Sequence, residues 1–103
     1  MSETEKIEQI LSQISSRPGV IGVVVTSKDG IPVKSTIPTQ DAGTYGLCVG
    51  ELVRKARIVL SDLTPNEKLR IFRIRSFKNE LIIIPDGDFI LLIIQDSSMS
   101  SQQ

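Results

Sequence analysis

The stretch LIIIPDGDFILLII, residues 81–94, decides the fold of this chain. It predicts two β-strands around a tight turn, because PDGD, residues 85–88, is typical turn sequence between runs of branched apolar residues. A strand with one buried face alternates apolar and polar residues, whereas these two strands are apolar at every position. Both faces of the sheet that contains them therefore require cover.

Three further strands are predicted outside this stretch. LRIFRIRS, residues 69–76, precedes it and turns into it at residues 76–79. VIGVVVT (20–26) and IPVKST (31–36) form a second hairpin around SKDG, in which Asp-Gly is a strong turn signal. Pro32 has no backbone N–H to give to a neighbouring strand, so we expect residues 31–36 at an edge of the sheet.

Two helices complete the predicted fold. Residues 3–16 carry Ile7, Ile10, Leu11 and Ile14 on one helical stripe, and Ser2 or Thr4 could cap its start. A longer helix is predicted from about residue 41 to residue 61. The order is α-β-β-α-β-β-β, and the hairpins favour an α+β fold with a single five-stranded, mostly antiparallel sheet.

Two helices are few for such a sheet. Five strands make a sheet roughly 20–25 Å across, whereas a helix is about 10 Å wide. Leaving five Ile or Leu side chains in water forfeits on the order of 10 kcal/mol. We therefore expect something outside the chain to cover part of residues 81–94.

The composition narrows the class of protein. The 103 residues suggest one domain, with residues 1–96 folded and the polar residues 97–103 forming a loose tail. Twelve basic residues balance twelve acidic ones, which argues against a strong nucleic-acid binder. No apolar run is long enough to span a bilayer, and the acidic start does not resemble a signal peptide, so we expect a soluble intracellular domain.

No set of residues suggests catalysis. The chain has no His and a single Cys, which excludes a Ser-His or Cys-His pair and makes zinc binding improbable. Cys48 is expected to be buried and structural, and Asp86 and Asp88 fit a turn better than a calcium loop. Gly43, Gly46 and Gly50 favour close helix packing over a phosphate loop. We therefore predict a protein without enzymatic activity and without a cofactor.

Arg73 and Arg75 are the charged residues that we consider the best candidates for a functional role. In a strand they point to the same side. They could bind an anion or an acidic partner, protect an exposed sheet edge from pairing, or flank a dimer interface.

The motifs together resemble the roadblock-type dynein light chains. The resemblance covers about residues 7–96, and its most specific parts are DGIPVKST (29–36), FRIRSFKNE (72–80) and the strand ending in IQD (94–96). It implies the roadblock/longin-like fold, with the element order predicted above.

The resemblance also implies a dimer, formed by two copies or by two paralogues. The strand at 69–76 is expected to pair with its counterpart, so that the sheet continues across the dimer, with the long helices packed beside it. The implied interface consists of Leu69, Ile71, Phe72, Arg73, Ile74 and Arg75 in the strand and of Val49, Leu52, Val53 and Ala56 in the helix.

The partner implied by the resemblance is the dynein intermediate chain. This chain would be a non-catalytic adaptor in motor assembly and cargo attachment, located in the cytoplasm on the cytoskeleton or in a cilium, with no nucleic-acid or membrane partner. A helix of the intermediate chain would supply the missing cover. The groove expected to receive it consists of Leu81, Ile83, Phe89, Leu91 and Ile93.

An alternative function is the scaffolding or regulation of a small GTPase, which roadblock-fold dimers also perform. Such a protein would use a dimer surface, for which the basic residues Arg54, Lys55 and Arg57 are candidates, against an acidic switch region.

Overall fold

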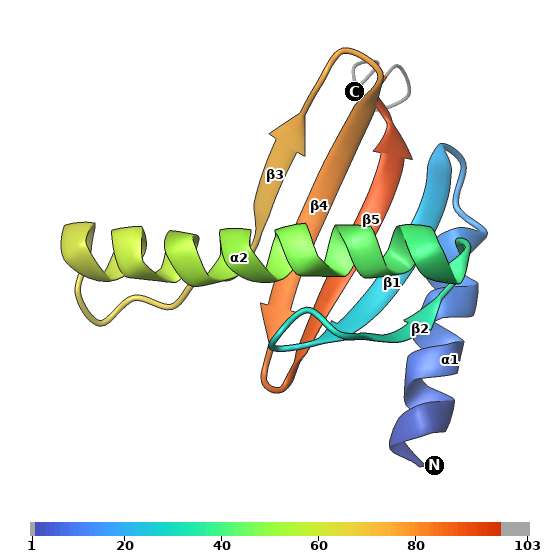
Figure 1. Ribbon diagram of the computed structural model, residues 1–103, viewed down its shortest axis with the longest axis horizontal. Helices are drawn as coiled ribbons and strands as arrows, with labels where there is room; N and C mark the ends of the chain where they lie inside the picture. The colour runs from blue at the N-terminus through green and yellow to red at the C-terminus, as the bar shows by residue number, and fades with distance from the viewer. Residues whose placement is uncertain (1, 98–103) are drawn as a thin grey trace.

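The sheet has the predicted strands and connections. The computed structural model describes residues 2–97, which form two helices and one five-stranded antiparallel sheet in the order β2-β1-β5-β4-β3 (Figure 1). The predicted order α-β-β-α-β-β-β is confirmed. The strands are β1 (Val20–Ser27), β2 (Pro32–Ser35), β3 (Phe72–Arg75), β4 (Asn79–Asp86) and β5 (Phe89–Asp96).

Glycines with positive φ close both predicted hairpins. Gly30 has a φ of 90° between β1 and β2, and Gly87 has a φ of 58° between β4 and β5. Only glycine adopts this conformation without steric cost. β2 lies at one edge of the sheet, where the missing N–H of Pro32 is tolerated, as predicted.

Helix α1 (Glu3–Ser15) packs on one face of the sheet. The Ser2 side chain caps it by accepting a hydrogen bond from the Glu5 backbone N–H at 3.1 Å. Leu11 is buried against Val23 and Val25 of β1, with Ile7 and Ile14 beside it. Three of the four apolar residues predicted from the helical spacing therefore form this smaller core, while Ile10 is exposed.

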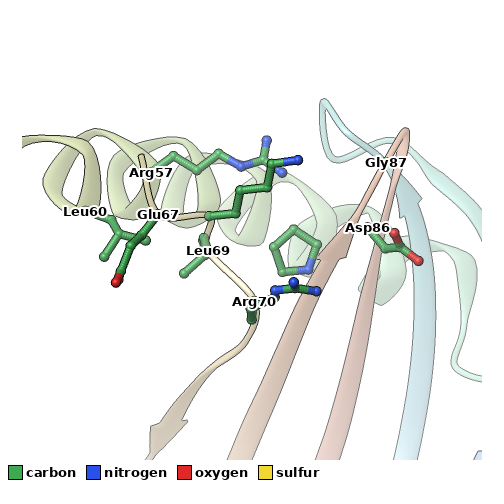
Figure 2. Close-up of a pocket in the computed structure, with 9 residues that line it drawn as sticks. Arg57, Leu60, Glu67, Leu69, Arg70, Asp86 and Gly87 are labelled. Atoms are coloured by element: carbon green, nitrogen blue, oxygen red, sulfur yellow. The ribbon is translucent and has the colours of Figure 1, made fainter. Parts of the chain in front are cut away.

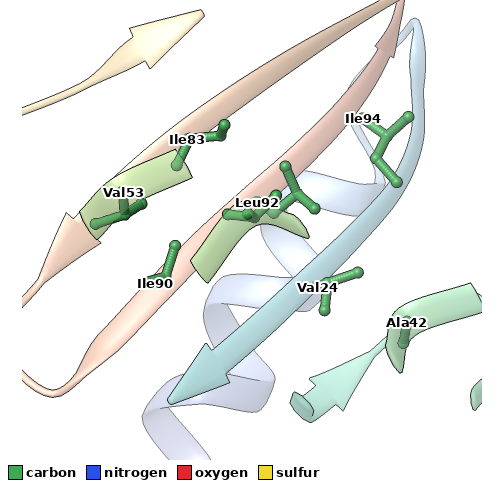
Figure 3. Close-up of a cluster of buried hydrophobic side chains, with 8 residues drawn as sticks. Val24, Ala42, Val53, Ile83, Ile90, Leu92 and Ile94 are labelled. Carbon is green, nitrogen blue, oxygen red and sulfur yellow. The ribbon is translucent and has the colours of Figure 1, made fainter. Parts of the chain in front are cut away.

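Helix α2 (Thr39–Leu63) packs on the other face, above the larger core (Figure 3). Val24 points to this side because its neighbours Val23 and Val25 point to α1. The core beneath α2 consists of Val24, Ala42, Val49, Val53, Ile83, Ile90, Leu92 and Ile94. No helix of residues 2–97 is long and apolar enough to cross a membrane.

The expectation that residues 81–94 need external cover is wrong for most of their side chains. Six of them are at most 9% exposed within the single chain: Ile82, Ile83, Ile90, Ile93, Leu92 and Ile94. We expected too little cover because a helix is narrower than the sheet. However, α2 runs across the strands, so that its length and not its width lies over the sheet (Figure 1). Its 25 residues give it a length of about 37 Å, which exceeds the width of the sheet.

Glycines allow α2 to touch the β1–β2 turn. A Cβ on Gly46 would fall onto the carbonyl oxygen of Gly30, and a Cβ on Gly50 would lie 3.1 Å from the carbonyl oxygen of Asp29. The packing interpretation of these two glycines agrees with the structure. A Cβ on Gly43 would meet nothing within 4 Å, so this glycine has no packing role.

The folded part extends one residue beyond the predicted boundary at residue 96. Ser97 is 6% exposed, and its hydroxyl donates a hydrogen bond to the Phe77 carbonyl at 2.6 Å. Its backbone N–H donates to the Lys78 carbonyl at 3.0 Å. The rest of the predicted tail, residues 98–103, lies outside the described residues.

We expect Ser97→Ala to lower the free energy of unfolding by about 1 kcal/mol, because it removes a buried hydrogen bond. Thermal melts of this variant and of a chain ending at Ser97 provide the measurement. The shortened chain should melt like the full chain. An unchanged melting temperature for Ser97→Ala would show that the contact with Phe77 contributes no stability.

Candidate interaction surface

The edge of β3 has no neighbouring strand within residues 2–97. β3 pairs with β4 on one side, with Phe72 opposite Ile83 and Ile74 opposite Leu81. Ile74 is 38% exposed, and Ile71, immediately before the strand, is 47% exposed. An open edge with exposed isoleucines favours pairing with another strand.

β3 is shorter than the predicted strand at 69–76. Leu69 precedes β3, and Phe72 is the first residue of β3. Both pack against the core beneath α2. The segment between α2 and β3 turns at Pro65-Asn66, where Asn66 has a φ of 75° and the Glu67 N–H donates to the Thr64 carbonyl at 3.2 Å. Pro followed by a residue with positive φ is typical of a type II turn.

One flank of α2 carries a second exposed apolar surface. Leu52, Val59 and Leu63 are 37%, 54% and 74% exposed. Their spacing of seven and four residues places them on one stripe of the helix. The C-terminal part of α2 extends beyond the β3 edge (Figure 1), so part of the helix has no sheet of its own beneath it.

The structure places the predicted α2 interface residues in different environments. Val49 and Val53 are 1% exposed and contact the sheet of their own chain, so their assignment to a dimer interface is corrected. Leu52 is exposed and Ala56 is half-buried, so their place in an interface stays a prediction. Cys48 is exposed, contrary to the expected burial, because it lies away from the sheet-facing side of the helix.

The predicted groove residues do not share one face. Ile83 and Leu81 pack beneath α2, whereas Phe89 and Leu91 pack beside α1. Ile93 lies opposite Val23, on the α1 side, and is 9% exposed. The five residues therefore cannot form a single groove, and Ile83, at 0% exposed, cannot contact a partner at all.

Arg73 and Arg75 contact groups of their own chain. The guanidinium of Arg73 lies 3.9 Å from a carboxylate oxygen of Glu80, and that of Arg75 donates to the Ser97 carbonyl at 3.4 Å. The Glu80 side chain is 6% exposed, and its second oxygen has no hydrogen-bond partner among the described residues. This carboxylate makes the Arg73 region less suited to an anion than the sequence suggested.

Two of the three basic residues of α2, Arg54 and Arg57, lie close together, whereas Lys55 does not. Arg54 donates a hydrogen bond to Glu51 at 2.9 Å, which lowers the pKa of the Glu51 carboxyl and raises that of Arg54. Lys55 lies about 200° around the helix from Arg57. Arg57 lines one cavity together with Arg54. It also lines a cavity of about 540 Å³ together with Lys68 and Arg70, two residues that the sequence did not single out (Figure 2).

The described residues contain no group of three or more His, Cys, Asp or Glu side chains that could hold a metal ion. The surfaces that do stand out are apolar or basic. Such surfaces suit the binding of another protein.

Comparison with known proteins agrees with the observed fold. The Roadblock/LC7 domain family matches residues 6–96. A Roadblock/LC7 domain from Streptomyces avermitilis superposes with a TM-score of 0.80 at 14% identity, covering 85% of this chain and 76% of that one.

Two MglB proteins, one of them described as a gliding protein, have the same fold. MglB of Myxococcus xanthus has a TM-score of 0.77 at 20% identity and covers 94% of this chain and 80% of its own. MglB of Thermus thermophilus has a TM-score of 0.77 at 12% identity. The match covers 91% of this chain and 73% of that one. At these identities the likeness shows the fold, and the family match identifies the group: the chain belongs to the Roadblock/LC7 domain family.

Proposed function

We propose that this protein is a non-catalytic, dimeric scaffold. The observation that carries the proposal is the presence of two exposed apolar surfaces, the β3 edge with Ile71 and Ile74 and the α2 flank with Leu52, Val59 and Leu63. These five residues are called the seam below.

A second copy would cover both parts of the seam at once. Pairing of β3 with the β3 of another copy would satisfy the open backbone groups of the edge and join the two sheets. The part of α2 that extends beyond β3 would then lie over the second sheet. A two-fold arrangement presents the same surface from each copy, which is the commonest form of a dimer.

Two classes of third partner are candidates, and different observations support them. The motifs at 72–80 and 94–96 favour the dynein intermediate chain, with a location on the cytoskeleton or in a cilium. The solved structures named above are of bacterial gliding and Streptomyces proteins, not of dynein light chains, which favours the small-GTPase scaffold instead. In both cases the dimer would hold partners without performing chemistry.

An affinity purification of the tagged full chain from native extract, with the bound proteins identified by mass spectrometry, tests the partner class. Dynein intermediate and heavy chains in the eluate would support the adaptor function, and the heavy chain would identify the motor. A small GTPase without dynein subunits would support the switch scaffold. A tagged chain with Ile71→Asp and Ile74→Asp is the control, because a partner that requires the dimer should be lost from it.

A further inference from the structure

The cavity beneath the end of α2 is lined by three cations from two segments. Arg57 comes from α2, and Lys68 and Arg70 come from the connection to β3. Figure 2 shows the Arg57 and Arg70 side chains on the side of this connection that faces the β4–β5 turn. The cavity has a volume of about 540 Å³, which is within the usual range for ligand sites.

None of these three cations has a carboxylate within 4.0 Å among residues 2–97. Three other cations of the described residues do have one, namely Lys34, Arg54 and Arg73. Glu67 and Asp86 line the same cavity but lie beyond ion-pair distance. The three cations outnumber these two carboxylates, so a bound anionic group would meet a lining of net positive charge.

The lining also has an apolar part. Leu60 and Leu69 are half-buried and Pro85 is buried, and all three line the cavity between the cations. A lone inorganic anion makes no use of such a surface. A peptide with acidic residues beside an apolar side chain complements both the charges and the apolar lining.

We propose that the cavity lined by Arg57, Lys68 and Arg70 is a docking site for an acidic peptide segment of a partner protein. The local charge carries this assignment, since the chain as a whole is neutral, with twelve basic and twelve acidic residues. Nucleic acid fits less well, because it requires a broad basic surface and the chain has no excess of basic residues. None of the five seam residues lines the cavity, and the proposal does not depend on the class of third partner.

The test uses a fluorescein-labelled peptide in which pairs of acidic residues alternate with leucine. A second peptide carries Asn and Gln in place of the acids. Binding to the full chain is measured by fluorescence anisotropy, and the site is located from amide chemical shifts in NMR spectra. We expect the acidic peptide to bind, and the amide shifts that it causes in the protein to cluster at residues 57–60, 67–70 and 86–87.

The matched variants each remove two positive charges. Lys68→Gln with Arg70→Gln changes the cavity, whereas Lys6→Gln with Lys55→Gln changes exposed lysines elsewhere. The cavity variant should bind the acidic peptide about tenfold or more weakly, because charge-assisted contacts are lost, while the control variant changes affinity less than about twofold.

Four results would overturn the proposal. They are an absence of binding by the acidic peptide, equal binding of the amide peptide, an equal loss of affinity in the control variant, and chemical shifts that cluster outside the cavity. A single-stranded oligonucleotide that displaces the peptide at equal charge concentration would assign the cavity to nucleic acid instead.

Discussion

Replacing Gly46 by alanine is expected to lower the free energy of unfolding by about 2–3 kcal/mol, even though alanine is the better helix former. The added Cβ falls onto the carbonyl oxygen of Gly30, which is backbone and cannot rotate away. Gly30 is itself fixed by its φ of 90° in the β1–β2 turn. α2 must therefore move away from the sheet, which loosens the contacts of Val49 and Val53 with the core.

Gly43→Ala is the matched control on the same helix. A Cβ there meets nothing within 4 Å, so the substitution should raise the free energy of unfolding by up to about 1 kcal/mol. Thermal or denaturant unfolding at one protein concentration measures both variants. Equal effects of the two substitutions would show that α2 does not approach the β1–β2 turn as closely as described.

Placing charges on the seam is expected to dissociate the proposed dimer. Ile71→Asp with Ile74→Asp should raise the dissociation constant at least about a hundredfold, because burial of two isoleucines from each copy is replaced by burial of carboxylates. Both side chains are exposed in the single chain, so the variant should still fold. Sedimentation equilibrium gives the dissociation constant, and circular dichroism checks the fold.

The opposite edge of the sheet supplies the control. Ile31, immediately before β2, is 65% exposed, and Val33, within β2, is 45% exposed. Replacing both by Asp introduces the same two charges as the seam variant. This control should dimerise like the unmodified chain. If it lost the dimer while the seam variant kept it, the interface would lie at β2.

The strands and their order along the chain could be predicted because they depend on local patterns. The Asp-Gly turns, the apolar runs and Pro32 each act within a few residues, and β2 lies at the edge that Pro32 requires. The N-cap at Ser2 is local in the same sense. The branched residues 81–94 also identified the centre of the sheet, since most of them are buried.

The direction of α2 across the sheet could not be predicted from these patterns. Helical spacing does not give the boundary between the sheet-facing residues of α2, such as Val49, and its exposed flank at Val59. That boundary depends on the angle at which the helix crosses the strands. The close approach of Gly46 to Gly30, sixteen residues earlier in the chain, helps to fix this angle.

Two of the three cavity cations could not be predicted from the sequence for a similar reason. Lys68 and Arg70 lie in an irregular connection, where no periodicity relates them to Arg57 on the helix. The turn at Pro65-Asn66 brings the connection back beneath α2. Pro-Asn is typical turn sequence, but the path of the chain after the turn depends on tertiary packing.

The central claim is that the seam is covered by a second copy of the chain. Sedimentation equilibrium of the unmodified protein at micromolar concentration tests it most directly. We expect a species with a mass of twice the 11.3 kDa of one chain. A mass of 11.3 kDa throughout the concentration range would contradict it, because the β3 edge and the α2 flank would then remain exposed to water in the isolated protein.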